Sequence, residues 1–143
     1  MTTEQPMRSL KVLIADDDQD DWYFAELAFK EAGLDHSVYF VKDGEELMDF
    51  LHQSLAPESI NELPDLILLD LNMPKKDGRV ALQEIRADSR FEKVNVVIFS
   101  TCISDEDKAY TSSLGASRHV TKPFEFTELV LTIKDICESC VVA

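Results

Sequence analysis

Short apolar segments alternate with amphipathic helical patterns five times along this chain, and this alternation restricts its possible folds more than any other feature. Several of the apolar segments are nearly continuous runs, which is typical of strands buried on both faces of a parallel sheet. Strands are expected at residues 10–15, 37–42, 65–70, 94–99 and 117–121, and helices at 20–32, 44–54, 78–88, 105–113 and 125–139.

A strand followed by a helix, repeated five times, predicts an α/β fold with a doubly wound parallel sheet and helices on both faces. With right-handed crossovers, a common order for five such strands is the flavodoxin-like order 2-1-3-4-5. A length of 143 residues suits one domain with a sizeable core. We expect this domain to span residues 9–139, with short terminal tails at 1–8 and 140–143.

Acidic, hydroxyl and basic side chains occur where the predicted strands end. In an open α/β sheet, ligands bind outside the carboxyl ends of the strands, at the point where the strand order reverses. In the order 2-1-3-4-5 this point lies between the first and third strands, next to the ends of the fourth and fifth. The residues expected there are Asp16, Asp17, Asp70, Ser100, Thr101, Thr121 and Lys122.

Three carboxylates at one edge of a sheet call for a cation. Two carboxylates about 5 Å apart repel by roughly 3 kcal/mol at an effective dielectric constant near 20. Mg²⁺ prefers oxygen ligands and usually takes one or two carboxylates together with a phosphate, and no Cys or His lies at these strand ends to favour zinc. A carboxylate beside Mg²⁺ and a lysine can act as a nucleophile toward a phosphoryl group.

Other residues near the strand ends are expected to shape the helices. Asp18, Asp20 and Asp21 precede or begin the first predicted helix, where they would cap its N-terminus and complement its dipole. Gly33 is placed to end that helix. Asp77 and Gly78 would form a loop and the start of the third helix.

Four motifs occur in the order and at the spacing of one known family: LIADD, LLDLNMPKKDG, IFST and LGASRHVTKPF. Over residues 9–139 the chain resembles the receiver domain of response regulators in two-component signalling. The resemblance implies that Asp70 accepts a phosphoryl group from the phosphohistidine of a sensor histidine kinase. It also implies that Ser100 and Lys122 contact that phosphoryl group. The implied Mg²⁺ ligands are Asp16, Asp17, Asp70 and, through its backbone carbonyl, Asn72.

The resemblance further implies a phosphorylation-switched surface made of the fourth helix, the fifth strand and the fifth helix, which in relatives often mediates dimerisation. Loop 55–64 and the motifs NMPKKDGR and LGASRHVTKPFEF are similar to those of single-domain regulators that pair with phytochrome-type histidine kinases. No output domain is expected, so surface contacts would carry the signal. Such a protein is no enzyme toward other substrates, because it promotes only its own phosphorylation and dephosphorylation.

Two family features concern the end of the fifth strand. The family normally has Tyr or Phe at the position of His119, and the ring turns inward upon phosphorylation. The histidine puts this aromatic switch in question, whereas phosphoacceptance does not depend on it. The alternative to a switching role is a partly exposed histidine at the edge of the sheet. The peptide bond between Lys122 and Pro123 is expected to be cis in this family.

The overall charge limits the possible partners. Twenty-eight acidic residues against 14 basic ones give a net charge of −14, and such a surface repels nucleic-acid backbones and anionic membranes. No apolar run is long enough to span a membrane, and the N-terminus lacks the features of a signal peptide, so the cytoplasm is the expected compartment. Cys137 and Cys140 end an amphipathic stretch, where core or surface thiols are favoured over a redox or zinc site.

Two other functions fit parts of the pattern. A phosphatase of the haloacid dehalogenase type also uses a strand-end aspartate and Mg²⁺, but it needs a second Asp two residues later as a general acid. The chain has Asn72 at that position, and an amide cannot donate and recover a proton in this way. A receiver-like scaffold that takes no phosphate would typically lack the acceptor or the lysine, and both Asp70 and Lys122 are present.

Overall fold

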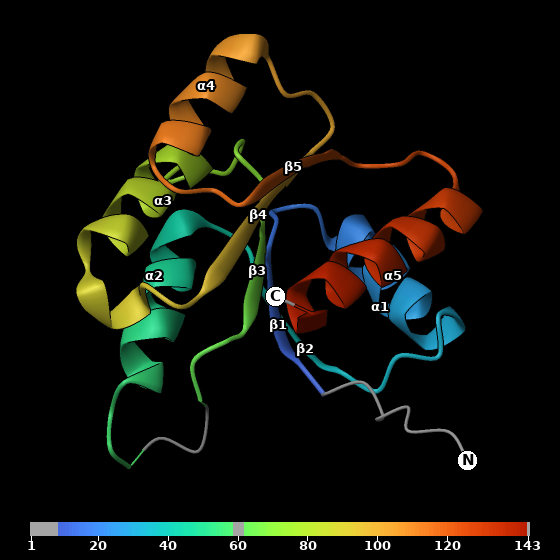
Figure 1. The fold of residues 1–143 in the computed structure, drawn as a ribbon, viewed down its shortest axis with the longest axis horizontal. Helices are drawn as coiled ribbons and strands as arrows, with labels where there is room; N and C mark the ends of the chain where they lie inside the picture. Colours follow the sequence, from blue (N-terminus) through green and yellow to red (C-terminus); the bar gives the residue numbers. More distant parts are fainter. Residues whose placement is uncertain (1–8, 59–61, 143) are drawn as a thin grey trace.

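The computed structural model, which describes residues 9–58 and 62–142, has a five-stranded parallel sheet between two layers of helices (Figure 1). The strand order is β2-β1-β3-β4-β5, which confirms the predicted order 2-1-3-4-5. The strands are β1 Lys11–Ala15, β2 Ser37–Val41, β3 Leu66–Leu69, β4 Asn95–Ser100 and β5 Arg118–Thr121. The helices are α1 Gln19–Glu31, α2 Gly44–Ser54, α3 Gly78–Ala87, α4 Asp105–Ser113 and α5 Phe126–Val142, with a 3₁₀ turn at Ser89–Phe91.

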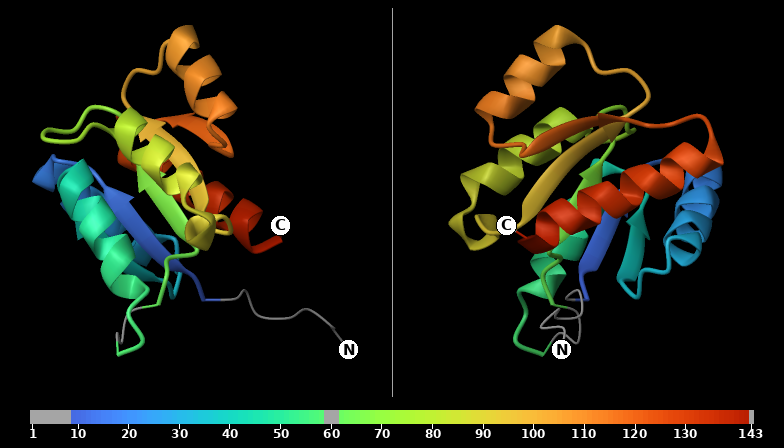
Figure 2. Two further views of the ribbon diagram at one scale, coloured as in Figure 1. Left: turned by 90° about the vertical axis from the view of Figure 1, so that its left-hand side faces the viewer. Right: turned by 45° about the vertical axis from the view of Figure 1, so that its right-hand side comes forward.

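Alternate residues of the central strands enter two separate cores, because successive side chains of a strand point to opposite faces of the sheet. Leu13 and Ile67 belong to the core beneath α2 and α3, whereas Val12 and Leu66 belong to the core beneath α1 and α5. The views in Figure 2 show the same two layers. The continuous apolar runs in the sequence therefore reflect burial on both faces of the sheet.

Local sequence signals define where the helices begin and end. The side chains of Asp18, Asp43, Asp77 and Ser104 act as N-caps of α1 to α4 and accept hydrogen bonds from backbone N–H groups of the first turn. Gly33 has a φ of 70° directly after the C-cap residue of α1, as expected for a glycine that stops a helix. The predicted roles of Asp77 and Gly78 are confirmed, because Asp77 is the N-cap of α3 and Gly78 is its first residue.

The structure also differs from the sequence-based predictions in places. The last helix continues past residue 139 to Val142, because Cys140 follows Ile136 by one turn and both pack into the core with α1. The Lys122–Pro123 bond is trans rather than cis, the isomer favoured by about 0.5–1 kcal/mol for X–Pro bonds. The predicted tail 1–8, residue 143 and positions 59–61 of the loop 55–64 lie outside the described residues.

The sequence predicted either core or surface thiols for the cysteine pair, and the structure places both thiols in the core. Cys137 and Cys140 are buried between α5 and the sheet, whereas Cys102 is exposed. Burial raises the pKa of the Cys137 thiol to about 12, which keeps it protonated and weakly reactive. None of the helices in the described ranges is both long and apolar enough to cross a lipid bilayer.

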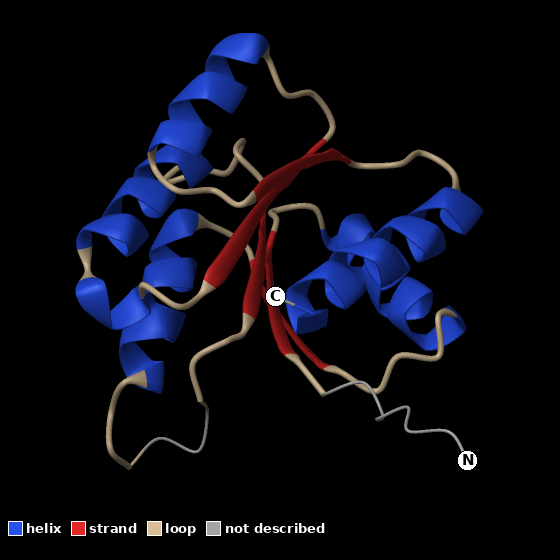
Figure 3. Cartoon of the chain, in the orientation of Figure 1, coloured by secondary structure: helices blue, strands red, loops and turns tan. Residues whose placement is uncertain are grey.

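Helix α4 precedes the edge strand β5 (Figure 3), and polar contacts hold it in place. Of its nine residues, Thr111 alone is buried. The Arg79 guanidinium on α3 donates two hydrogen bonds of 2.7 Å to the Asp107 carboxylate. On the other side, the Thr111 hydroxyl oxygen lies 2.6 Å from Nε2 of His119 on β5.

A close backbone approach fixes the loop between β3 and α3. A Cβ atom added to Gly78 would lie 2.4 Å from the backbone oxygen of Asp70 and 2.8 Å from Cα of Leu71. The Gly78 N–H also donates to the Leu71 carbonyl at 3.0 Å. Glycine therefore lets the start of α3 lie directly against the end of β3.

We expect Gly78→Ala to lower the free energy of unfolding by about 2–3 kcal/mol, because the clash is with backbone atoms that cannot rotate away. Urea denaturation followed by circular dichroism measures the change. Gly33→Ala is the control, because its added methyl group meets open space and the positive φ alone should cost about 1 kcal/mol. An unfolding free energy of Gly78→Ala equal to or above that of the wild type would contradict this account of the loop.

Candidate functional site

The carboxyl ends of four parallel strands meet at one edge of the sheet. Asp16 follows β1, Asp70 follows β3, Ser100 ends β4, and Lys122 follows β5. Backbone hydrogen bonds fix their register, because Asp70 N–H donates to Ala15 O at 3.0 Å and Lys122 N–H donates to Ser100 O at 2.9 Å. All four residues are buried, with exposed fractions of the whole residue of 9% or less.

The Asp70 carboxylate accepts hydrogen bonds on both oxygens. Its Oδ1 accepts from the Ser100 hydroxyl at 2.8 Å and from the Asn72 backbone N–H at 3.0 Å, and its Oδ2 accepts from the Lys122 ammonium at 2.8 Å. The Ser100 oxygen in turn accepts from the Leu71 backbone N–H at 2.9 Å. Asp70 is therefore oriented by groups from three different segments of the chain.

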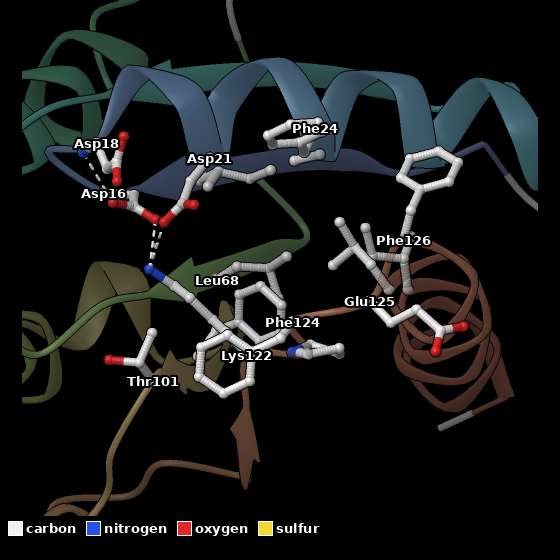
Figure 4. A pocket seen from close by; sticks show the side chains of 16 residues that line it. Asp16, Asp18, Asp21, Phe24, Leu68, Thr101, Lys122, Phe124, Glu125 and Phe126 are labelled. Atoms are coloured by element: carbon white, nitrogen blue, oxygen red, sulfur yellow. Dashed lines mark hydrogen bonds and ion pairs between the residues drawn. The ribbon is translucent and has the colours of Figure 1, made fainter.

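The Lys122 ammonium connects three carboxylates of the site, two of which, Asp16 and Asp21, are drawn in Figure 4. Its Nζ donates to Oδ2 of Asp16 at 2.6 Å, of Asp70 at 2.8 Å and of Asp21 at 3.0 Å. Asp21 lies in the first turn of α1, where local sequence indicated only a charge that complements the helix dipole. The structure adds a second role, because its side chain turns toward the end of β5.

Burial and charge act on the two most enclosed groups in opposite directions. Burial raises the pKa of Asp16 to about 6, against the hydrogen bonds from Lys122 and from the Asp18 N–H. For Lys122, burial lowers the pKa, but the hydrogen bonds to Asp16 and Asp70 outweigh it and raise the pKa above its ordinary value. The ammonium is consequently charged at neutral pH, and the carboxylates around it carry an excess of negative charge.

The donor set suits a hard divalent cation. Asp16, Asp17 and Asp70 each offer one carboxylate oxygen, and these three oxygens lie within 4.8 Å of one another. Asp17 is exposed, whereas the other two are buried, so the group opens toward solvent on one side. Carboxylate oxygens favour Mg²⁺ or Mn²⁺, and the cluster contains no thiolate or imidazole that would favour zinc.

The single tryptophan supports the loop that carries the acidic pair. The Trp22 indole N–H donates to the backbone oxygen of Asp16 at 2.7 Å. Its ring stacks on Phe40 of β2, with centroids 5.2 Å apart and an interplanar angle of 24°. The backbone after β1 is therefore held from α1 and from the sheet at once.

A cavity of about 310 Å³ extends from the acidic group between α1, α5 and the connection from β5 to α5. Asp16, Asp21 and Lys122 line its polar end, and Phe24 and Phe126 line its apolar end (Figure 4). Thr101 lies beside Lys122 at the polar end, so this threonine borders the site without joining its hydrogen bonds to Asp70.

His119 is hydrogen-bonded rather than free at the edge of the sheet. The Thr111 hydroxyl donates its proton to the Asp107 backbone oxygen at 2.7 Å, so its oxygen accepts from Nε2 of His119 at 2.6 Å. Burial lowers the pKa of His119, and the nearby Lys108 adds to this effect. His119 is partly buried on the edge strand, in agreement with the prediction of a partly exposed histidine there. Its hydrogen bond to Thr111 also connects β5 with α4.

Comparison with known proteins identifies the family. The model of the response regulator receiver domain matches residues 12–134. The chain belongs to this family. The receiver is similar to the response regulator Rcp1 of Synechocystis sp., at 31% identity over 125 residues that cover 87% of this chain and 84% of that protein.

Solved structures agree with this assignment. The receiver is similar to the phosphorylated cyanobacterial phytochrome response regulator RcpA, with a TM-score of 0.82 and 33% identity over 95% of this chain and 96% of that one. It is also similar to the Mn²⁺-bound form of Rcp1, with a TM-score of 0.80 and 29% identity over 92% and 94% of the two chains. The receiver is thus related to phytochrome-associated response regulators.

The structure brings together most of the residues that the sequence singled out. Asp16, Asp70, Ser100 and Lys122 form one hydrogen-bonded group, and Asp17 joins the carboxylate cluster. Asn72 is exposed and contributes its backbone N–H to Asp70. Sequence reasoning missed the contacts of Asp21 with Lys122, of Trp22 with Asp16 and of Thr111 with His119.

We expect Ser100→Ala to lower the free energy of unfolding by about 1–3 kcal/mol, because it leaves the buried Leu71 N–H without its acceptor. Chemical denaturation of the unphosphorylated protein measures this cost. Thr101→Ala removes an exposed hydroxyl one residue away and should change stability by less than about 0.5 kcal/mol. Equal stability of the two variants would show that the Ser100 hydroxyl is not needed to satisfy this backbone group.

Proposed function

We propose that this receiver accepts a phosphoryl group on Asp70 from the phosphohistidine of a sensor histidine kinase. The observation that carries the proposal is the position of the Asp70 carboxylate. It directly follows the central strand β3, next to the Asp16 and Asp17 carboxylates, and it is hydrogen-bonded to Lys122 and Ser100. A nucleophile, a cation site, an ammonium and a hydroxyl are the groups that phosphoryl transfer to a carboxylate uses.

Each side chain then has a defined task. An Asp70 oxygen attacks phosphorus, the P–N bond of the donor breaks, and the imidazole nitrogen leaves with the bonding electrons. Lys122 transfers one of its hydrogen bonds to a phosphoryl oxygen and offsets the new negative charge. Ser100, already bonded to the acceptor at 2.8 Å, donates its hydrogen to another phosphoryl oxygen.

Mg²⁺ is the cation proposed for the site, held by Asp16, Asp17, Asp70 and the backbone carbonyl of Asn72. The three carboxylate oxygens within 4.8 Å support this assignment, as does the Mn²⁺ bound by the related Rcp1. When bound, the cation neutralises oxygens of the transferring group. Its charge also offsets the repulsion among the carboxylates that Lys122 alone leaves uncompensated.

The kinase partner is proposed to be of the phytochrome type, on the basis of the similarity to RcpA and Rcp1. Changes at Ser100 and Lys122 would reach the surface of α4, β5 and α5 through the backbone bond that joins the two residues. This surface would bind a target or a second receiver. We further propose that residues 9–139 act as one receiver in the cytoplasm, with no activity on other substrates.

Intact-mass measurements with acetyl phosphate and Mg²⁺ test phosphoacceptance. The wild type should gain one phosphoryl adduct that is lost when Mg²⁺ is chelated, and Asp70→Asn should gain none, because an amide is not a nucleophile toward phosphorus. Asp49→Asn, an exposed position on α2, is the control and should behave as the wild type does. Absence of an adduct on the wild type would support a scaffold instead.

Titration with Mn²⁺ tests the cation site separately. Trp22 is the one tryptophan of the chain, and its indole contacts the Asp16 backbone, so its fluorescence should be quenched as the paramagnetic ion binds. Asp17→Asn should weaken this binding roughly tenfold or more. Asp20→Asn removes an equal charge outside the carboxylate cluster and should leave the affinity nearly unchanged. Equal affinities of the two variants would exclude Asp17 as a ligand.

A further inference from the structure

The Lys122 ammonium has no hydrogen-bond donor to spare. An ammonium group has three N–H donors. Here the Nζ atom contacts three carboxylates, with distances of 2.6 Å to Asp16, 2.8 Å to Asp70 and 3.0 Å to Asp21. A phosphoryl oxygen can therefore gain a bond from Lys122 only if one of these three bonds is given up.

The three bonds are not equally held. The Asp16 and Asp70 side chains are 4% and 11% exposed, whereas the Asp21 side chain is 40% exposed. Water can replace the ammonium at an exposed carboxylate at little cost, but not at a buried one. The contact to Asp21 is also the longest of the three. The bond to Asp21 is thus the one that can be given up at the lowest cost.

We infer that Asp21 is a positioning residue that holds Lys122 in the unphosphorylated state and so limits how readily Asp70 is phosphorylated. This inference rests on the proposed function. The contact stabilises the receiver before transfer and is lost during it. After transfer, the Asp21 carboxylate would face a phosphoryl group of like charge across the same ammonium, which opposes the product further.

The placement of Asp21 supports a role at the site beyond helix capping. Capping of α1 is already provided by Asp18, whose side chain accepts from the Asp20 N–H at 2.9 Å. Asp21 lies beside Asp16 and Lys122 at the polar end of the cavity (Figure 4). Neighbouring Asp20 is exposed, and its side chain is not among the groups bonded to Lys122.

The test compares Asp21→Asn with Asp20→Asn, which removes the same charge from the same turn. Each full-length protein is incubated with Mg²⁺ and acetyl phosphate, and the rate of adduct formation on Asp70 is followed by intact mass. We expect Asp21→Asn to be phosphorylated roughly fivefold faster than the wild type, the factor appropriate to one partly exposed ion pair. Asp20→Asn should match the wild type.

Two outcomes with an active wild type overturn the inference. An Asp21→Asn rate equal to or below that of the wild type would mean that Asp21 does not restrain Lys122. Equal acceleration by both variants would mean that general charge near the site, rather than the contact, is responsible. If the wild-type protein forms no phosphoryl adduct, the proposed function is wrong, and so is the inference that rests on it.

Mn²⁺ affinity, measured through Trp22 fluorescence, distinguishes a restraint on Lys122 from a role in holding the cation. Asp21→Asn should bind Mn²⁺ within about twofold of Asp20→Asn, because Asp21 is outside the carboxylate cluster. A loss of tenfold or more in Asp21→Asn alone would make Asp21 a contributor to the cation site and overturn the inference.

Discussion

The contact of one ammonium with three carboxylates is the interaction on which the site depends. Lys122 joins the ends of β1 and β3 and the first turn of α1 to the end of β5. Burying a charge is costly unless partners satisfy it, and here every donor of the ammonium has an acceptor. Three carboxylates surround one ammonium, so their negative charge is only partly balanced. The arrangement that stabilises Lys122 therefore also favours the binding of a second cation.

The packed layer of α1 and α5 keeps the contact around Lys122 in place, whereas α4 is less tightly packed. Helices α1 and α5 share an apolar core with the sheet, and this layer fixes the loop after β1 through Trp22. Helix α4 buries one residue and is held by an ion pair to Arg79 and a hydrogen bond to His119. Polar, solvent-accessible contacts open at lower free energy than packed cores. Under the proposed function, a change at Ser100 or Lys122 would therefore alter the position of α4 more readily than that of α1.

Much of this could be predicted from the sequence because it follows from short-range patterns. Apolar runs gave every strand to within about one residue, and parallel strands bring their carboxyl ends to one edge, which placed Asp16, Asp70, Ser100 and Lys122 together. The Asp21 contact could not be predicted, because it depends on how α1 is rotated against β5. Local sequence offered a sufficient reason for an acid in a first helical turn. The bond between Thr111 and His119 likewise depends on the distance between a helix and a strand.

Under the proposed function, phosphoacceptance is an exchange of hydrogen-bond partners around Lys122 rather than the binding of a phosphoryl group to free donors. Every group that would bind the phosphoryl oxygens is already bonded: Ser100 to Asp70, and Lys122 to three carboxylates. The free energy of transfer then depends on the bonds that are lost as much as on those that form. A receiver can thus change its response by altering an acid beside the site, with the acceptor, the cation ligands and the lysine all unchanged.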